Sequence, residues 1–323
     1  MSGERIVGGL DDPLDDGGLF QMKPEPTIFL RDRYMEPPFT VLDRRQGAWQ
    51  TRDRQWKALG IRSELGRDAP VLKSTLQGSD KFASETSIFS PALAELMYRW
   101  YSKPGAVVLD PFAGGSVRGI VAGTLGRPYI GVELSGDQVK ANMAQVHIVP
   151  EDKPRPQWHE GDSREVLADW AKQGPGADMI MSCPPYAYLE RYSDDPADLS
   201  NMPYPKFLEA YGDIIAAAGA LLSPDRFAVW VIGEVRERSG HGACLGLVAD
   251  TIKLFQQAGM HLYNDHIMLT PIGTAPQRAP KQFDAGRKAG RVHEYALVFV
   301  KGDARKAAQW LGAVVDKATE EET

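Results

Sequence analysis

The chain has 323 residues, 43% of them hydrophobic, which is enough for one large core and a smaller appended region. It holds no uncharged apolar run of about 18 residues, and its first residues lack the order of a signal peptide, so we expect neither a membrane span nor a secretory leader. A net charge of −6 argues against a generally basic nucleic-acid binder, and two cysteines cannot make a disulfide framework or a zinc cluster, so a reducing cytoplasm is the expected setting.

The charge is distributed unevenly along the chain. Residues 1–26 carry a net charge of −4 and residues 316–323 a net charge of −3, which leaves the centre close to neutral. Within the centre, residues 31–67 and 273–301 each hold four more basic than acidic side chains. Such local excesses are compatible with contacts to phosphate, although ordinary solvated surfaces show the same pattern.

The first 80 residues lack the regular alternation of strands and helices that follows them. Residues 1–26, rich in Gly and Asp, are expected to form a mobile acidic leader, and residues 27–80 form an Arg- and Trp-rich region. Trp49 and Trp56 are seven residues apart and share one face of a predicted helix. Docking of this helix through both tryptophans is one interpretation, and stacking of a tryptophan on a base is the other.

From about residue 86 the pattern alternates between strand and helix. Helices are predicted over 90–102, 116–126, 136–146, 206–222 and near 245–258, and strands over 106–110, 127–134, 178–186, 227–235, 261–269 and 294–302, with a short strand and a helix within 158–173. We therefore expect an α/β fold over residues 81–304: a three-layer α/β/α, Rossmann-like domain with a mostly parallel seven-stranded sheet and an antiparallel C-terminal strand pair. Residues 305–323 should form a C-terminal helix and an acidic tail.

A turn of small residues follows the first buried strand of this domain. The strand ends at Asp110, and Gly114 and Gly115 open the next helix, where free backbone amide groups can face a ligand at close range. No Lys-Ser/Thr pair follows the glycines, which disfavours a nucleoside triphosphate loop, and the GxGxxG arrangement is absent as well. The turn by itself is weak evidence for a ligand site.

Two acidic residues close the next two strands. Glu133 ends the second strand, where a carboxylate can accept hydrogen bonds from both hydroxyls of a ribose. Asp162 ends the third strand, where a carboxylate can accept from an adenine amino group. Either residue alone fits a helix cap or a surface group equally well. Together with the glycine turn, they indicate an adenosine site at the ends of neighbouring strands.

A rigid proline corner ends the fourth strand. Pro184 and Pro185 have no free amide, so the corner fixes a backbone carbonyl that points outward, with Tyr186 beside it. An exocyclic base amine is a poor nucleophile, and hydrogen bonds accepted from its N–H groups concentrate the lone pair on nitrogen. Tyr186 would stack on a base swung out of the duplex. The alternative interpretation is an ordinary proline turn in a loop.

Taken together, DPFAGG at 110–115, IGVE at 130–133 and CPPY at 183–186 resemble the motifs of the amino-group DNA methyltransferases, which make N6-methyladenine or N4-methylcytosine in bacteria and their phages. The resemblance covers about residues 86–302. It implies a class I methyltransferase fold, S-adenosylmethionine as the cofactor, double-stranded DNA as the partner and base flipping. It also implies a cytoplasmic protein of a bacterial cell, or one encoded by a phage. The sequence leaves room for a homodimer.

The resemblance also implies roles for individual residues. Asp110, Phe112 and Gly114 would line the methionine half of the cofactor, Glu133 would take the ribose and Asp162 the adenine. With their neighbours, the candidate cofactor residues are Asp110, Pro111, Phe112, Ala113, Gly114, Gly115, Ser116, Glu133, Leu134, Asp162 and Ser163. The candidate catalytic residues at the target base are Ser182, Cys183, Pro184, Pro185 and Tyr186.

The chain departs from the family pattern at Cys183, because the family usually has Asp, Asn or Ser before the two prolines. Sulfur is a weak acceptor, so the target amine would depend on the Pro184 carbonyl or on Ser182, and the target base stays open between adenine and cytosine. The thiol also allows a second mechanism, in which Cys183 adds to a cytosine ring and the methyl group goes to carbon 5. An RNA base methyltransferase and a catalytically weak DNA-binding regulator are the remaining alternatives.

Only about 70 residues separate the glycine turn from the proline corner, too few for a sequence-recognition domain. Recognition is therefore expected from residues 27–80, from a lid or a fixed loop at 188–205, or from a flexible loop at 270–293. The last segment offers phosphate and guanine contacts through Arg278, Lys281, Arg287, Lys288 and Arg291.

Two further points concern residues near the predicted site. The six histidines do not group with cysteine at metal-ligand spacing, so we expect no metal. Glu234 and Arg236, at the end of the fifth strand, either support the site or form a structural ion pair.

Overall fold

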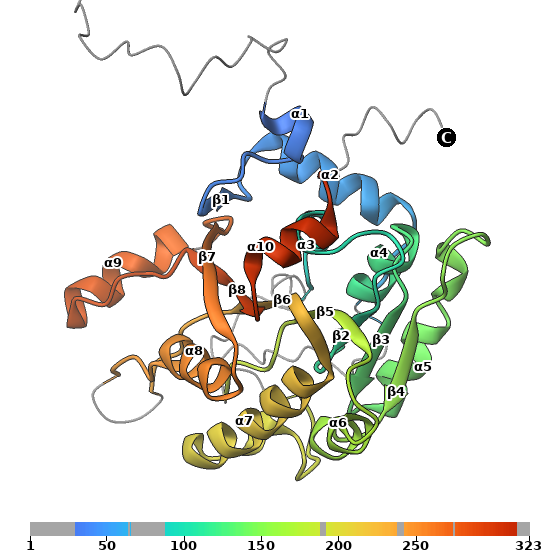
Figure 1. Ribbon diagram of the computed structural model, residues 1–323. Helices are drawn as coiled ribbons and strands as arrows, with labels where there is room; N and C mark the ends of the chain where they lie inside the picture. Colours follow the sequence, from blue (N-terminus) through green and yellow to red (C-terminus); the bar gives the residue numbers. More distant parts are fainter. Residues whose placement is uncertain are drawn as a thin grey trace, which may run out of the picture.

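The computed structural model describes residues 30–63, 65, 88–187, 192–237, 242–273 and 275–314. In this part of the chain a central eight-stranded sheet lies between two layers of helices (Figure 1). The strands are β1 (Val41–Asp43), β2 (Val108–Asp110), β3 (Tyr129–Glu133), β4 (Gln157–Glu160), β5 (Ala177–Ser182), β6 (Leu222–Ile232), β7 (His261–Leu269) and β8 (His293–Lys301). The predicted acidic leader and tail lie outside the described residues.

The sheet has the strand order β1-β7-β8-β6-β5-β2-β3-β4. Neighbouring strands are parallel, except that β8 runs antiparallel to both β6 and β7. The predicted Rossmann-like fold, with its mostly parallel sheet and antiparallel C-terminal pair, is confirmed. The sheet has one strand more than the predicted seven, because β1 from the N-terminal region pairs with β7, with Leu42 opposite Met268. A three-residue strand gives no periodic signal in the sequence.

The helices cover the two faces of the sheet and build two cores. One core contains side chains of α2 (Gly47–Ala58), α3 (Pro91–Tyr101), α4 (Val117–Thr124) and α10 (Ala304–Leu311), with α5 (Gly136–Met143) packed against it. The other contains side chains of α6 (Ser163–Ala171), α7 (Tyr204–Leu221) and α8 (Leu247–Gln257). Strand β6 serves both, because Phe227, Val229 and Val231 face the first core and Ala228, Trp230 and Ile232 the second.

The N-terminal region docks onto the first layer through its two tryptophans. Trp49 and Trp56 of α2 are both buried. The indole N–H of Trp49 donates to Ser90 Oγ (3.3 Å), and that of Trp56 donates to Glu95 Oε2 (2.6 Å). Arg52 forms a bidentate ion pair with the same buried carboxylate of Glu95. The docking interpretation of this tryptophan pair is confirmed, and neither ring is available to stack on a base.

Residues 270–293 differ from the predicted loop, because α9 (Ala275–Gly286) occupies the middle of the segment. Pro276 lies in the first turn, where a missing N–H leaves no bond unmade, while Pro280 lies inside the helix. The Ala, Gln, Arg and Lys residues around the prolines are good helix formers. Figure 1 shows α9 at the periphery, outside both helical layers, and none of its residues is buried. The remaining α-helix, α1 (Leu30–Tyr34), comes first in the described chain and precedes β1.

The parallel strands place the predicted motifs along one edge of the sheet. The carboxyl ends of β2, β3, β4, β5 and β6 all lie at this edge. Because β8 is antiparallel, its first residues lie there too, with Tyr295 opposite Ile232. The strand order reverses between β2 and β5, where α4 follows onto one face and α7 onto the other. The glycine turn and the proline corner therefore leave the sheet side by side.

Candidate active site

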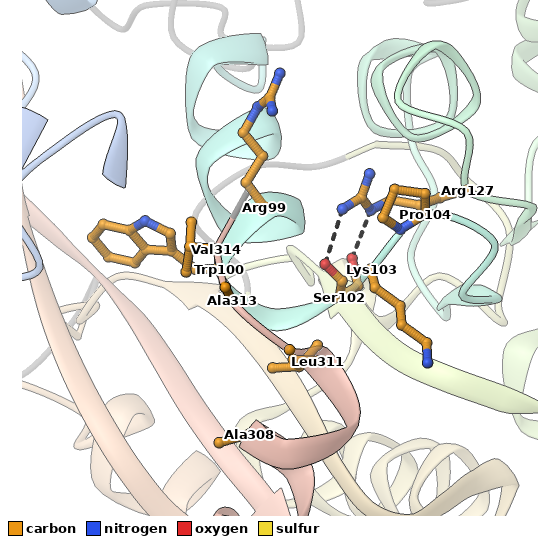
Figure 2. A pocket seen from close by; sticks show the side chains of 11 residues that line it. Arg99, Trp100, Ser102, Lys103, Pro104, Arg127, Ala308, Leu311, Ala313 and Val314 are labelled. Carbon is orange, nitrogen blue, oxygen red and sulfur yellow. Dashed lines mark hydrogen bonds between the residues drawn. The ribbon is translucent and has the colours of Figure 1, made fainter. Parts of the chain in front are cut away.

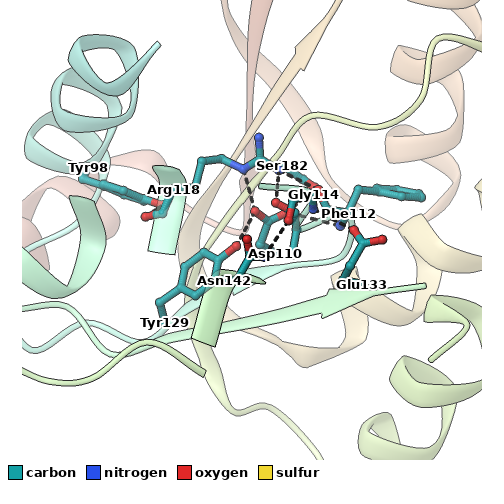
Figure 3. A network of polar contacts seen from close by, with 10 residues as sticks. Tyr98, Asp110, Phe112, Gly114, Arg118, Tyr129, Glu133, Asn142 and Ser182 are labelled. Atoms are coloured by element: carbon teal, nitrogen blue, oxygen red, sulfur yellow. Dashed lines mark hydrogen bonds and ion pairs between the residues drawn. The ribbon is translucent and has the colours of Figure 1, made fainter. Parts of the chain in front are cut away.

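A buried carboxylate organises the glycine turn. Asp110 ends β2 and has no exposed surface. Its Oδ1 accepts hydrogen bonds from the Ser182 hydroxyl (2.6 Å) and the Phe112 amide (3.2 Å). Its Oδ2 accepts from Arg118 Nε (2.6 Å) and the Tyr129 hydroxyl (2.8 Å) (Figure 3). With both oxygens engaged inside the protein, Asp110 shapes the turn from beneath rather than facing outward.

Arg118, which the sequence analysis missed, clamps the same turn. Its guanidinium donates to the Phe112 carbonyl (2.5 Å) and the Ala113 carbonyl (3.0 Å), and it lies over the Phe89 ring. Burial alone would lower the pKa of Arg118, but the charge of Asp110 outweighs burial and raises it. A single arginine on an apolar helix carries no motif, so only the structure identifies this contact.

Glu133 and Gly114 lie together, as the sequence predicted. The Glu133 carboxylate accepts from the Gly114 amide (2.8 Å) and from the Ser135 amide (2.9 Å). Gly114 has a φ of +51°, a left-handed conformation that side chains rarely adopt. Leu134, between Glu133 and Ser135 in the sequence, is half-buried. The end of β3 therefore contacts the glycine turn directly.

The end of β4 lies at the same edge. Asp162 is the N-cap of α6, accepts from the Arg164 amide (2.9 Å) and forms an ion pair with the Arg164 side chain (2.5 Å). The Ser163 hydroxyl donates to the Pro111 carbonyl of the glycine turn (2.5 Å). The cap interpretation of Asp162 is thus confirmed, and its place beside the turn leaves the adenine role as a prediction.

Ser182 faces inward at the start of the proline corner. Its hydroxyl is fully buried, donates to Asp110 and accepts from the Phe112 amide (3.1 Å). This position does not fit the alternative in which Ser182 accepts a hydrogen bond from the target amine. The hydroxyl instead fixes the corner against the glycine turn.

Cys183 and Tyr186 pack against each other at the outer side of the corner. Cys183 Sγ lies 3.7 Å from the Tyr186 hydroxyl, and both side chains are half-buried, as is Pro185, while Pro184 is buried. Burial raises the pKa of the Cys183 thiol to about 12. At neutral pH the sulfur is therefore a protonated thiol, which argues against its use as a nucleophile.

Glu294 is a second residue at this edge that the sequence did not indicate. The pairing of Tyr295 with Ile232 places Glu294 level with Gly233, the residue that follows β6. A methyl group added at Gly233 would lie 3.1 Å from the Tyr186 ring and 3.9 Å from Glu294 Cγ. After burial, the charge of Glu294 is among the causes that raise the pKa of both Cys183 and Tyr186.

Glu234 and Arg236 have structural contacts at the end of β6. Glu234 Oε1 accepts from the amides of Gly246 and Leu247 (both 3.0 Å) and so caps α8. Arg236 donates to the Gly242 carbonyl (3.0 Å). Both residues hold the connection between β6 and α8.

Part of the predicted lid is a compact turn. Asp198 is buried and accepts hydrogen bonds from the amide and hydroxyl of both Ser193 and Ser200, at 2.7 to 3.0 Å. This network favours a fixed loop for residues 192–203. Residues 188–191, next to the corner, lie outside the described residues.

The candidate DNA contacts lie on α9 or directly after it. The connection from β7 to β8 begins and ends at the same sheet edge as the glycine turn, because β7 runs parallel to β6. The candidate side chains there are exposed, namely Arg278, Lys281, Arg287, Lys288 and Arg291. In the other basic region, Arg52 is paired with Glu95 and Arg45 with Asp43 (2.7 Å), so part of that excess has internal partners.

A pocket near the end of α3 lies at the opposite, amino edge of the sheet (Figure 2). Arg127, in its wall, donates to the Ser102 hydroxyl (2.8 Å) and the Ser102 carbonyl (2.9 Å). Lys103 lies over the Trp310 ring. These contacts are structural, and the pocket is separate from the glycine turn.

Comparisons with known proteins give one family match and one curated relative. Residues 29–144 match the model of the N6_N4_Mtase family, described as DNA methylase. The chain is 32% identical over 69 residues to the DNA adenine methyltransferase YhdJ of Escherichia coli (strain K12); the match covers 21% of this chain and 24% of YhdJ. The chain thus spans about a quarter of this curated relative. The predicted resemblance to amino-group DNA methyltransferases is confirmed over residues 29–144.

Two solved structures are similar in fold. TrmN from Thermus thermophilus is 19% identical with a TM-score of 0.41, covering 66% of this chain and 49% of its own. The magnesium protoporphyrin IX methyltransferase ChlM from Synechocystis PCC 6803, solved with bound SAM, is 14% identical with a TM-score of 0.38, covering 62% and 71%.

Two searches of the described residues give negative results. None of their helices is long and apolar enough to cross a membrane. They also contain no group of three or more His, Cys, Asp and Glu side chains placed to hold a metal ion.

Proposed function

We propose that the protein transfers a methyl group from S-adenosylmethionine to an exocyclic amine, adenine N6 or cytosine N4, of a flipped-out base in double-stranded DNA. One observation carries the proposal: the residues predicted to bind adenosine and the proline corner lie at one sheet edge, joined through the glycine turn by hydrogen bonds. The Gly114 amide meets Glu133 at 2.8 Å, and the Phe112 amide meets Ser182, next to the corner, at 3.1 Å.

The residues present fit the cofactor. Glu133 closes the second strand of the domain beside the turn, where it can take a ribose. The Ser116 hydroxyl, directly before α4, is buried without a hydrogen-bond partner among the described residues, and small residues let a ligand approach the turn. When bound, S-adenosylmethionine supplies an electrophilic methyl group.

The residues of the corner orient the target base. Tyr186 offers a ring for stacking, and the Pro184 carbonyl accepts a hydrogen bond from the exocyclic amine. Asp110, Arg118 and Ser182 hold the glycine turn against the corner, which keeps the amine in line with the methyl donor.

Glu294 supplies the acceptor that is missing at Cys183. Its carboxylate is 35% exposed and forms a 3.9 Å ion pair with Arg44, and its Cγ and the Tyr186 ring both lie next to Gly233. A carboxylate is a strong acceptor, whereas the protonated thiol of Cys183 is a weak one. As nitrogen bonds to the methyl group and loses a proton, Glu294 can receive that proton.

The basic residues on and after α9 are proposed to contact the phosphates of the duplex, because they are exposed and their connection starts from the site edge. In the same proposal residues 27–80 form an N-terminal region, residues 81–304 the catalytic domain and residues 305–323 a C-terminal helix and tail.

The test is incubation of the purified protein with labelled S-adenosylmethionine and separate DNA and RNA pools, followed by mass spectrometry of the nucleosides. We expect label in N6-methyldeoxyadenosine or N4-methyldeoxycytidine. Label only in ribonucleosides would favour an RNA methyltransferase, and 5-methyldeoxycytidine would favour the cysteine mechanism. Cofactor binding with no labelled product would indicate a regulator. A Tyr186→Ala variant controls for contaminating activity.

A further inference from the structure

A short segment of the N-terminal region lies against the glycine turn. We call residues 61–65 the strap; Ile61, Arg62, Ser63 and Leu65 are its described residues. A methyl group added at Gly115 would lie 2.9 Å from Ser63 Cβ and 3.0 Å from Ser63 Oγ. Real Cβ atoms do not come this close, so glycine at position 115 is what allows Ser63 to sit on the turn.

Buried side-chain amides on α5 and just after it hold the strap in place. Gln145 exchanges two hydrogen bonds with Arg62: its Oε1 accepts from the Arg62 amide (2.7 Å), and its Nε2 donates to the Arg62 carbonyl (2.9 Å). Gln138, which lies on α5, donates to the Leu65 carbonyl (2.9 Å). Side-chain amides are costly to bury without partners, and here the backbone of the strap provides those partners.

The glycine turn is attached to the same helix face. Asn142, also buried, donates to the Gly114 carbonyl (2.7 Å) and accepts from Gln138 (2.9 Å). The strap and the turn are therefore both held by buried side-chain amides, two on α5 and one, Gln145, just after it. Ser63 is thus held in a fixed position beside the glycine turn.

Two hydroxyl groups near this contact lack hydrogen-bond partners in the part of the chain that the structure describes. Ser63 Oγ and Ser116 Oγ are both buried, and neither has a hydrogen-bond partner among the described residues. Ser116 directly follows Gly115, against which Ser63 packs, and α4 begins with the next residue. The amides of a first helical turn point toward this end and favour an anionic group. Two unused hydroxyl donors beside them complete an arrangement suited to a carboxylate.

We propose that Ser63 binds the carboxylate of the amino-acid end of S-adenosylmethionine, together with Ser116 and the start of α4. The inference rests on the proposed function, because it assumes that this cofactor occupies the turn. It assigns part of residues 27–80 to the cofactor instead of to DNA. Ser63 then makes binding depend on the carboxylate, and so selects the intact amino-acid end over analogues that lack it.

The experiment compares two ligands that differ only in this group. S-adenosylmethionine and its decarboxylated analogue are titrated calorimetrically into the full chain and into the Ser63→Ala variant. Because Ser63→Ala removes a hydrogen bond to a charged group, it should lower the affinity for S-adenosylmethionine about tenfold and leave the affinity for the analogue unchanged. Ser63→Cys, which keeps the volume but is a weak donor, should give the same pattern.

A matched control comes from the far end of α4. Thr124 also has a buried hydroxyl with no partner among the described residues, but it is the last residue of that helix. Thr124→Val should leave both affinities unchanged. Thermal unfolding of each variant, measured without ligand, reports whether the fold is retained.

The outcomes separate this inference from the proposed function. If the wild-type chain binds S-adenosylmethionine and both Ser63 variants bind it as tightly as the wild type does, the Ser63 assignment is wrong and the proposed function stands. A parallel loss for both ligands also overturns the assignment, since the carboxylate is then not the group that is recognised. If the wild-type chain binds neither ligand, the proposed function fails, and the inference fails with it.

Discussion

The hydroxyl of Ser182 donates a 2.6 Å hydrogen bond to the carboxylate of Asp110, and so joins the end of β5 to the end of β2. These are the two strands between which the order of the sheet reverses, with α4 leaving onto one face and α7 onto the other. The bond fixes the proline corner relative to the glycine turn. The same carboxylate neutralises Arg118, so one buried group supports both halves of the proposed site.

Replacing Asp110 with Asn should destabilise the whole domain. Arg118 would keep its buried charge but lose its partner, and breaking a buried pair in this way costs about 3–5 kcal/mol. Urea unfolding at neutral pH measures the loss. Asp137→Asn is the matched control, because its ion pair with Lys140 is largely exposed and should contribute less than about 1 kcal/mol. Equal effects of the two substitutions would contradict the organising role of Asp110.

The sequence was sufficient to predict which strand ends meet. Alternating strands and helices imply a parallel sheet, and a parallel sheet brings the residues after successive strands to one edge. Glu133 and Gly114 were predicted to lie together on that basis, and their 2.8 Å hydrogen bond bears this out. The prediction needed only the order of the elements, not the details of packing.

The missed residues depend on packing or on strand direction. Arg118 acts through contacts inside a core, which no motif encodes. Glu294 reaches the site edge only because β8 is antiparallel and enters the sheet beside β6. The strap reaches the glycine turn through side-chain amides on α5 and just after it, which are far away in sequence. Long-range contacts of this kind leave no local pattern.

Stability should fall in acid through Glu95, which anchors α2 on α3. Burial favours the protonated form, but hydrogen bonds and charge from Arg52, with Trp56 and Arg99, outweigh burial and hold the pKa of Glu95 below its ordinary value of 4.5. The unfolded chain then binds the proton more readily, so this contribution is fully present above pH 4.5 and is lost as the pH falls through the lower, folded-state pKa.

Glu95→Gln isolates this effect. The variant should be less stable than the wild type at pH 7, and the difference should shrink as the pH falls from about 5 to 3. Urea unfolding of both proteins across this range is the measurement. A difference that stays constant with pH would mean that the carboxylate charge does not hold the two helices together.

Cys183 should be inert as a nucleophile. With a thiol pKa of about 12, it carries almost no thiolate at pH 8, whereas Cys244 is exposed and serves as the internal control. Iodoacetamide should therefore modify Cys244 and spare Cys183, as mapped by peptide mass spectrometry. Cys183→Ser should keep methyl transfer within a few-fold. Loss of all activity in this variant, with 5-methyldeoxycytidine as the wild-type product, would support the rival mechanism.

The basic side chains after α9 should contribute to DNA affinity. Arg287 and Lys288 are exposed beside the connection that leaves the site edge. Changing both to Ala should weaken DNA binding. It should also make the slope of log K against log salt shallower by about 2, because the loss of two phosphate contacts lowers the number of counterions released on binding. Lys172→Ala, at the end of α6, removes one positive charge away from this segment and should have little effect. An unchanged slope would remove this segment from the interface.

Glu294 offers the sharpest test of how the protein compensates for Cys183. If its carboxylate accepts the hydrogen bond of the target amine, Glu294→Ala should lower the methylation rate at saturating cofactor by about tenfold to a hundredfold, with cofactor affinity unchanged. Glu209→Ala, on the exposed side of α7, controls for loss of a negative charge elsewhere.

Rescue then separates the acceptor role of Glu294 from a merely structural one. Adding Cys183→Asp to the Glu294→Ala variant puts a carboxylate before the two prolines, where the resembling family has Asp, Asn or Ser, and should return most of the lost rate. A structural defect at β8 would not be repaired by a change at β5. Full activity of the single Glu294→Ala variant would instead leave the amine to the Pro184 carbonyl alone.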